Sequence, residues 1–291
     1  MGGSIIGAKE VKRMKRPARV AAIHDMSGFG RCSLGVVMPV LSAMGAQCCP
    51  MPTAFLSAQT AFPKSDRAVF LDMTDQLERT GAHWQELGAE FDAIYSGFLG
   101  SETQIGLLGE FIGKFRREHT LVVVDPVMGD WGKPYRTYTP DLCRRMGELA
   151  EHADVITPNL TEAAILLQEE YDPAPGEGKV RQWLERLSIE GKRSVVMTGI
   201  VPEEGLVGAA CFDRESGEFS TPVTRRVPVE YSGTGDLFAS VMLGGLLRGE
   251  SLHESAARSV DFVQRCAALT RELGGDRREG VMYERLLKEL I

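Results

Sequence analysis

Several of the commonest catalytic signatures are missing from this 291-residue chain. It has no Gly-x-x-x-x-Gly-Lys-Ser/Thr loop, no Gly-x-Ser-x-Gly and no His-Glu-x-x-His. These absences exclude P-loop kinases and argue against the usual serine hydrolases and zinc peptidases. The six cysteines form no Cys-x-x-Cys pair, so we expect no zinc site and predict reduced thiols in a cytoplasmic protein. No apolar run reaches the ~18 residues of a membrane span, and no membrane partner is expected.

Positive charge is scarce outside the N-terminus. Residues 1–19 carry six basic residues and one acidic residue, a net of +5, and the whole chain carries -7, so the remainder carries -12. An acidic body argues against nucleic acid as a partner. We predict a disordered basic leader over residues 1–17 and a single domain over 18–291, which is long enough to bury a large core.

The sequence pattern of the first half of the predicted domain indicates alternating strands and helices. The continuous apolar run Ala18 to Ile23 is typical of a strand buried on both faces. A glycine turn and then apolar residues at helical spacing follow, which is how a doubly wound α/β fold begins. A dinucleotide site is not favoured, because Ser33 stands at the third glycine position and the second strand, Gln47 to Thr53, ends without an acidic residue.

Polar residues follow two further predicted strands. The apolar run 121–124 ends in Asp125-Pro-Val-Met-Gly-Asp130, and the run 154–156 ends in Thr157-Pro-Asn-Leu-Thr-Glu162, which opens a helix. Ligands of open α/β sheets bind at such strand ends. A carboxylate there suits a magnesium shell, usually through water. The simpler alternative is a solvated turn at Asp125 and a helix start with Thr161 as the cap and Glu162 in the first turn.

The stretch 229–240 carries the strongest signal. Gly233 and Gly235 permit a tight turn before a helical run, and such a turn leaves the first helical N–H groups free to bind an anion. Asp236 lies in the first turn. A carboxylate beside an anion site is poor for holding phosphate but suits the transfer of a phosphoryl group to an alcohol. The alternative is an ordinary helix N-terminus, with Asp236 favourable to the helix dipole.

Taken together, these loops resemble those of the ribokinase-like superfamily, in its vitamin-kinase branch, the pyridoxal/pyridoxamine (pyridoxine) kinases. The motifs occur in the family's order and span residues ~18 to ~275, and such a set is far more specific than each motif alone. The resemblance implies a three-layer α/β/α fold with a mostly parallel central sheet, and a homodimer. It also implies MgATP-dependent phosphorylation of the 5′-hydroxymethyl group of vitamin B6. Whether K⁺ is required stays open.

The resemblance also implies roles for individual residues. Asp236 matches the catalytic base, and Gly233, Thr234 and Gly235 match the anion hole. The residues that match nucleotide-site positions of the family are Asp125, Thr157, Asn159, Glu162 and Thr198. Of these, Asp125 and Glu162 also match positions that bind magnesium through water. Asp25, Thr60 and Phe98 match the family positions that hold the B6 ring, and Phe98 stands where many members have tyrosine.

Two alternatives remain at this point. The Ser27-Gly28-Phe29-Gly30 loop looks more like that of the hydroxymethylpyrimidine kinases of thiamin synthesis, although those usually carry Cys where Asp236 stands. A non-catalytic vitamin-binding protein is the alternative of another class. It would have no reason to keep Asp125, Glu162 and Asp236 together. We therefore expect a B6 kinase that prefers pyridoxal or pyridoxamine.

Overall fold

The computed structural model describes residues 16–63, 65–136 and 138–291. The leader predicted over 1–17 lies outside these residues except for Arg16 and Pro17, and so it stays a prediction. Arg16 forms an ion pair with Asp92, at 2.7 Å.

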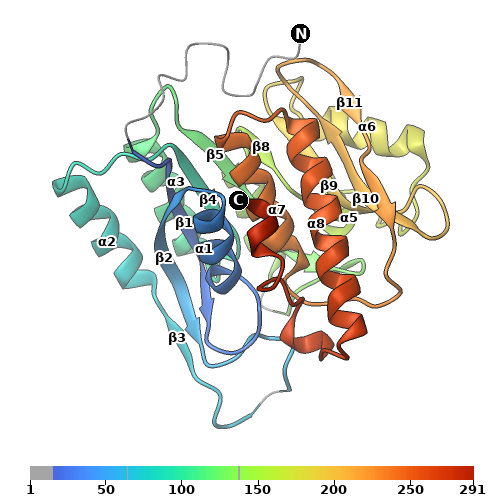
Figure 1. Cartoon of the computed structure of the whole chain (residues 1–291). Helices are drawn as coiled ribbons and strands as arrows, with labels where there is room; N and C mark the ends of the chain where they lie inside the picture. Colours follow the sequence, from blue (N-terminus) through green and yellow to red (C-terminus); the bar gives the residue numbers. More distant parts are fainter. Residues whose placement is uncertain (1–15, 64, 137) are drawn as a thin grey trace.

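A central sheet organises the fold (Figure 1). Its strands are β1 (Arg19–Ser27), β2 (Gln47–Leu56), β3 (Phe70–Asp72), β4 (Ala93–Ser96), β5 (Leu121–Val124), β8 (Val155–Ile156), β9 (Ser194–Ile200), β10 (Leu206–Phe212), β11 (Phe219–Ser220) and β12 (Val223–Arg225). Their order is β11-β10-β9-β8-β5-β4-β1-β2-β3, with β12 also beside β10. The six strands from β2 to β9 in this order run parallel, and the strands at both edges pair antiparallel. The prediction of a mostly parallel sheet is confirmed.

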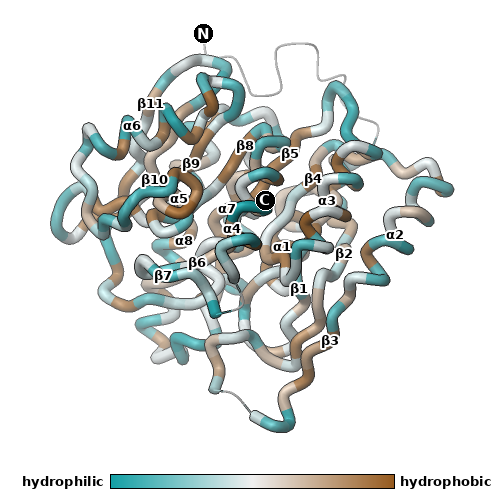
Figure 2. Tube along the Cα trace, turned by 180° about the vertical axis from the view of Figure 1, so that it is seen from behind, coloured by the Kyte–Doolittle hydropathy of each residue, from teal (hydrophilic) through white to brown (hydrophobic). Residues whose placement is uncertain are grey.

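Helices cover both faces of the sheet. One face packs against α1 (Leu34–Ala43), α7 (Thr234–Leu247) and α8 (Leu252–Glu272), and this is the face seen in Figure 1. The other face packs against α2 (Thr74–Glu86), α3 (Glu102–Phe115), α4 (Pro140–Ala150), α5 (Leu160–Leu167) and α6 (Glu177–Leu187), and Figure 2 shows the molecule from that side. Each face has its own apolar core, so the three layers implied by the resemblance are present.

Strand β1 illustrates why the central strands are apolar throughout. Val20 and Ala22 point into the core under α1 and α7, whereas Ala21 and Ile23 point into the core under α3, and all four are 1% exposed or less. A strand buried on both faces needs apolar side chains in both directions. The strand also runs further than predicted, to Ser27. His24 and Asp25 are therefore part of the sheet.

Some elements differ from the predictions. The hairpin of β6 (Gly129–Asp130) and β7 (Lys133–Pro134) is too short to show a periodic pattern. Helix α4 is not among the predictions, although Leu142, Met146 and Leu149 recur at helical spacing and are buried. Thr198 and Gly199 directly follow the apolar run of β9, where a turn would be the simplest prediction, yet both lie inside the strand. The segment 61–72, which lacks periodicity, contributes β3 to the sheet edge.

The cysteines and the helix lengths bear on two of the predictions from the sequence. All six cysteines are free, as the prediction of reduced thiols requires, and Cys48 and Cys49 are partly exposed. None of the helices in the described part of the chain combines the length and apolar character needed to cross a bilayer.

Candidate active site

The carboxyl ends of the parallel strands bring the predicted loops to one edge of the sheet. Asp25 lies near the end of β1, Asp125 follows β5, and α7 begins with Asp236 in its first turn. The three carboxyls are close enough to influence one another, since Asp236 raises the pKa of Asp125 and Asp25 raises that of Asp236. The same edge holds Thr157, Asn159, Glu162 and Thr198, and Asn159 and Thr198 pair as an isolated parallel bridge.

Helix α7 begins at a glycine for two reasons. Gly233 has a φ of +74°, in the left-handed region that favours glycine, and a Cβ there would lie 2.0 Å from the carbonyl oxygen of Arg31. A glycine offers no side chain to cap the helix. Within the described residues no acceptor takes the backbone N–H groups of Thr234, Gly235 and Asp236; the first bond is from Leu237 N to Gly233 O, at 3.1 Å. This helix end is therefore open to an anion.

Asp236 is partly buried beside those free N–H groups. Its side chain is 15% exposed, and its Oδ2 accepts a hydrogen bond of 2.8 Å from the backbone N–H of Ser33. Burial raises the pKa of Asp236 to about 7, the Ser33 N–H lowers it, and the charge of Asp25 raises it. A carboxyl with a pKa near neutrality can both take up and release a proton at physiological pH.

Ser33 connects two of the carboxyl groups. Its φ of 48° is unusual for a residue with a side chain. In this conformation its N–H donates to Asp236, while its hydroxyl donates to Asp25 Oδ1, at 2.6 Å. The Ser27 hydroxyl donates to Asp25 Oδ2, at 3.1 Å. Burial raises the pKa of Asp25 and the two hydroxyls lower it. Sequence reasoning assigned no role to either serine.

Asp125 and Glu162 form a second acidic pair. They are 6% and 3% exposed. Burial raises the pKa of Asp125 to about 8, with a further rise from Asp236 and a decrease from the Thr157 hydroxyl. The pKa of Glu162 is also raised, first by burial and then by Asp125. Two buried carboxyls that repel each other favour a bound cation or a shared proton.

The N-terminus of α5 is closed by its own side chains. Asn159 Oδ1 accepts from the N–H groups of Thr161 and Glu162, at 2.8 and 3.0 Å, and Glu162 Oε2 accepts from Asn159 N, at 2.8 Å. This is a capping box. The cap is thus Asn159 rather than Thr161, whose hydroxyl instead accepts from Gly132 N, at 2.9 Å. Glu162 Oε1 accepts from Met128 N, at 3.1 Å.

The donor set at this edge fits magnesium only in part. Among the described residues, no three acidic, histidine or cysteine side chains converge on one point where a metal ion could sit. Asp125 and Glu162 supply two carboxylates. Magnesium commonly binds one or two carboxylates and completes its six ligands with water and substrate phosphates. The residues present therefore fit an ion held jointly with a nucleotide.

The residues expected around the substrate ring are less closely gathered. Phe98 is half-buried, with its ring edge-on to Tyr138 at a centroid distance of 6.1 Å. Thr60 lies in an exposed turn, and no described contact connects it to Asp25 or Phe98. The preceding residue, Gln59, is buried against Gly30. Gln59 was not singled out from the sequence, where its amide carries no distinguishing pattern.

A short segment near the C-terminus holds three of these loops. In η1 (Arg277–Glu279) the carbonyl of Glu279 accepts from Arg31 N at 2.8 Å, and that of Arg277 accepts from Ser232 N at 3.2 Å. The carbonyl of Arg278 accepts from the Gln59 side chain. These three backbone acceptors join the loop after β1, the loop after β2 and the turn before α7.

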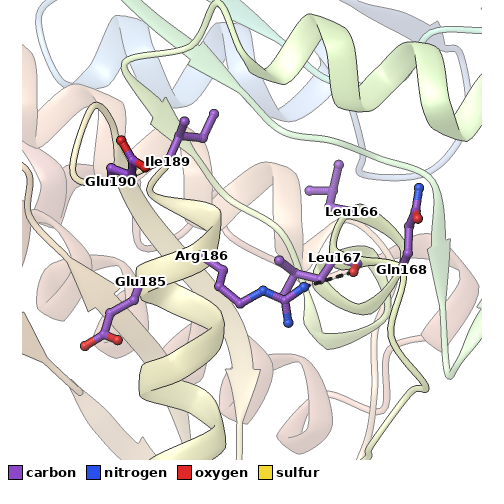
Figure 3. Close-up of a pocket in the computed structure, with 7 residues that line it drawn as sticks. All are labelled: Leu166, Leu167, Gln168, Glu185, Arg186, Ile189 and Glu190. Atoms are coloured by element: carbon purple, nitrogen blue, oxygen red, sulfur yellow. Dashed lines mark hydrogen bonds between the residues drawn. The ribbon is translucent and has the colours of Figure 1, made fainter.

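A separate hollow of about 620 Å³ lies between the end of α5 and α6 (Figure 3). Arg186 reaches across it to the carbonyl of Leu167, at 3.3 Å. None of the predicted site residues lines this hollow, so it is distinct from the sheet-edge site.

Comparisons with known proteins agree with this fold. A pyridoxine/pyridoxal/pyridoxamine kinase of Bordetella avium is 30% identical, over 87% of this chain and 85% of its own. The crystal structure of pyridoxal kinase from Lactobacillus plantarum matches with a TM-score of 0.86 and 31% identity, over 94% of this chain and 96% of the other. A Bacteroides thetaiotaomicron protein assigned to the phosphomethylpyrimidine kinases, crystallised with pyridoxal, matches with a TM-score of 0.90 and 39% identity, over 94% and 96%.

The fold and these relatives define the class: a small-molecule kinase of the ribokinase-like fold. Residues 42–280 match the phosphomethylpyrimidine kinase family, and the chain belongs to that family. The resemblance to the vitamin-kinase branch is confirmed. The name of the family points to a pyrimidine, whereas the curated relative named above is a B6 kinase.

Proposed function

We propose that this kinase transfers the γ-phosphoryl group of ATP to the 5′-hydroxymethyl group of a B6 vitamer, with pyridoxal or pyridoxamine preferred. The observation that carries the proposal is the pairing of Asp236 with the uncapped N-terminus of α7. A base and an anion site meet there, and phosphoryl transfer to an alcohol needs both. The names of the relatives, and the pyridoxal bound to the Bacteroides protein, support the choice of substrate.

In the proposed step, Asp236 removes the proton from the substrate hydroxyl. The oxygen attacks the γ-phosphorus, the bond from that phosphorus to the bridging oxygen breaks, and ADP leaves with the electron pair. The N–H groups of Thr234 and Gly235, with that of Asp236 itself, face the charge that develops on the transferring group. Asp236 then returns its proton to solvent.

Asp125 and Glu162 would hold magnesium, partly through water, and the ion would supply charge neutralisation for the phosphates. Thr157, Asn159 and Thr198 lie at the same edge and would form the nucleotide side of the site. The proposal also includes a cytoplasmic homodimer, as the resemblance implies. Dependence on K⁺ is to be measured directly by comparing KCl with a tetramethylammonium salt.

The ring of the vitamer would lie between Asp25 and Phe98, with Thr60 at the outer side. Both oxygens of Asp25 already accept from serine hydroxyls, so a ring hydroxyl or amino group would join an existing network. This arrangement accepts either a pyridine or a pyrimidine. The first loop and the family match favour hydroxymethylpyrimidine as the second candidate, and Asp236 in place of cysteine favours B6.

The test is a comparison of kcat/KM for pyridoxal, pyridoxamine, pyridoxine and hydroxymethylpyrimidine under one MgATP condition. We expect a B6 vitamer to have the highest value. A preference for the pyrimidine of more than about tenfold, which is ~1.4 kcal/mol in transition-state binding, would overturn the B6 assignment. Absence of phosphate transfer to all four would leave a non-catalytic vitamin-binding protein.

A further inference from the structure

A buried histidine lies directly behind the proposed base. His24 is on β1, on the side of the sheet that α7 covers, and is 0% exposed. Neither of its ring nitrogens has a hydrogen-bond partner among the described residues. Leaving a buried polar atom unpaired is costly. An apolar side chain would suit this position better, unless the imidazole has a partner in the working enzyme.

The surroundings fit the imidazole closely. A Cβ on Gly97 would lie 2.3 Å from His24 Nδ1 and 2.6 Å from its Cε1, so residue 97 has to be a glycine to leave room for this edge of the ring. The ring of Tyr95 packs edge-on against the imidazole at a centroid distance of 4.3 Å. These two contacts hold the imidazole in place.

The edge of the ring that carries Nδ1 faces Asp236. Nδ1 lies 4.0 Å from Asp236 Oδ1, while Oδ2 is already bonded to Ser33 N. Among the described residues no hydrogen bond reaches Oδ1. Burial lowers the pKa of His24 to about 3, so the imidazole is neutral at physiological pH and has one N–H to donate.

We propose that His24 is a positioning residue for Asp236: it keeps Nδ1 protonated and donates this N–H to Oδ1, while Ser33 holds Oδ2. The inference rests on the proposed role of Asp236 as the base. A separation of 4.0 Å is longer than a hydrogen bond, and catalytic hydrogen bonds commonly tighten only in the complex with substrate. His24 neither gains nor loses a proton during the reaction.

The donor has a defined effect on the base. A second N–H on the carboxylate stabilises its ionised form and offsets part of the burial that raises the pKa of Asp236. The groups whose charges interact with Asp236 come from several elements: Asp25, Cys32, Tyr95, Asp125 and Tyr135. Every replacement of His24 removes its edge-on contact with Tyr95. A difference among the replacements therefore reports the position of the N–H rather than the loss of that contact.

Three substitutions of His24 in the full-length chain separate the role of Nδ1 from packing. His24→Leu fills similar space without a donor. His24→Asn places an amide N–H near the position of Nδ1, and His24→Gln places one near the position of Nε2. The matched control is Ser96→Ala, because Ser96 is also buried and unpartnered but pairs with Ile23 and Val124, which face the opposite core.

We expect His24→Leu to lower kcat by about 10- to 100-fold, the effect of losing a hydrogen bond to a charged group, with KM for both substrates little changed. The acidic limb of its pH–rate profile should move to higher pH by about one unit or more, since the pKa of Asp236 rises. His24→Asn should recover kcat to within about threefold, and His24→Gln should not. Ser96→Ala should keep the wild-type profile.

The proposal is overturned if His24→Leu keeps the wild-type kcat and pH profile, or if Leu, Asn and Gln lose activity equally. A second measurement needs no folded variant: ¹⁵N-histidine spectra of the wild-type enzyme with ADP and pyridoxal. A neutral His24 protonated on Nδ1 supports the inference, and protonation on Nε2 contradicts it. If Asp236→Asn proves fully active, the proposed base itself has failed, and that outcome is distinct from an inert His24.

Discussion

Two helices begin at the same edge of the sheet and treat their first N–H groups in opposite ways. At α5 the side chain of Asn159 accepts two of them, and Glu162 completes the capping box. At α7 the cap position is Gly233, and within the described residues the first three N–H groups have no acceptor.

The difference shows how one structural device can serve stability or chemistry. A capped end contributes to the stability of the fold but has no donors left for a ligand. An uncapped end gives up that contribution and keeps its donors and its positive dipole for an anion. In this fold the capped helix also supplies a carboxylate to the proposed metal, and the uncapped helix supplies the proposed base.

The largest expected effect comes from removing the base beside the uncapped helix. Asp236→Asn should lower kcat by ~10² to 10⁴, because general-base catalysis contributes about that factor. Nucleotide affinity, measured by calorimetry, and the melting temperature should stay close to wild type. A variant that retains more than about a tenth of kcat would reduce Asp236 to a favourable residue in the first helical turn.

The pKa of about 7 gives the same residue a pH signature. Asp236 must be ionised to act, so kcat/KM should level off above about pH 7 and fall with increasing acidity below it, by up to about tenfold per pH unit. The acidic limb of the kcat profile should lie at lower pH than that of kcat/KM, since bound magnesium favours the ionised form of Asp236. A flat profile between pH 5 and 8, well on both sides of this pKa, would contradict the assignment.

The next effect is expected from placing a charge on the open helix end. A Cβ at Gly235 meets no atom within 4 Å, so Gly235→Asp can be accommodated. The added carboxylate should raise the melting temperature slightly through the helix dipole, yet lower kcat/KM for MgATP by about tenfold through repulsion. Gly235→Asn, which is similar in shape and uncharged, is the control. Equal losses for Asp and Asn would mean that size rather than charge matters.

A smaller change should follow at the capped helix. Glu162→Gln keeps one acceptor, which can serve Asn159 N so that the capping box survives, but it leaves Met128 N without its acceptor. The magnesium concentration for half-maximal activity should increase severalfold, while pyridoxal binding without nucleotide stays unchanged. An unaltered magnesium titration would leave Glu162 with structural roles only, in the capping box and as the acceptor of Met128 N.

The smallest effect concerns stability. Asn159→Ala removes the cap of α5 and should cost about 0.5–2 kcal/mol in the free energy of unfolding. Thr139→Ala at the start of α4 is the comparison, since its hydroxyl caps that helix by accepting from Leu142 N at 3.1 Å and it is not among the proposed site residues. Both variants should melt earlier, but Asn159→Ala alone should also weaken nucleotide binding. Loss of activity in the Thr139 variant would show that destabilisation by itself explains the result.

How much of this could be read from the sequence depends on whether a signal is local. Short sequence patterns predict the buried strands and the Gly233 turn. The spacing of Asn159 and Glu162 also fits a capping box, which could have been recognised. Ser33 and His24 carry no such pattern. The strained φ of Ser33 and the burial of His24 against Gly97 arise only when distant segments pack together. Thr60 and Gln59 are neighbours, and only the fold decides which of them turns inward.

The η1 segment has a consequence for when activity appears during synthesis. Its carbonyls hold the loops at Arg31, Gln59 and Ser232, all of which precede it in the chain. Because the chain is synthesised from its N-terminus, most of the sheet can fold before residues 277–279 are added. The nascent protein can thus be largely folded while its catalytic loops still lack their backbone partners. Competence to turn over substrate would therefore wait until residues 277–279 have been made and have docked on these loops.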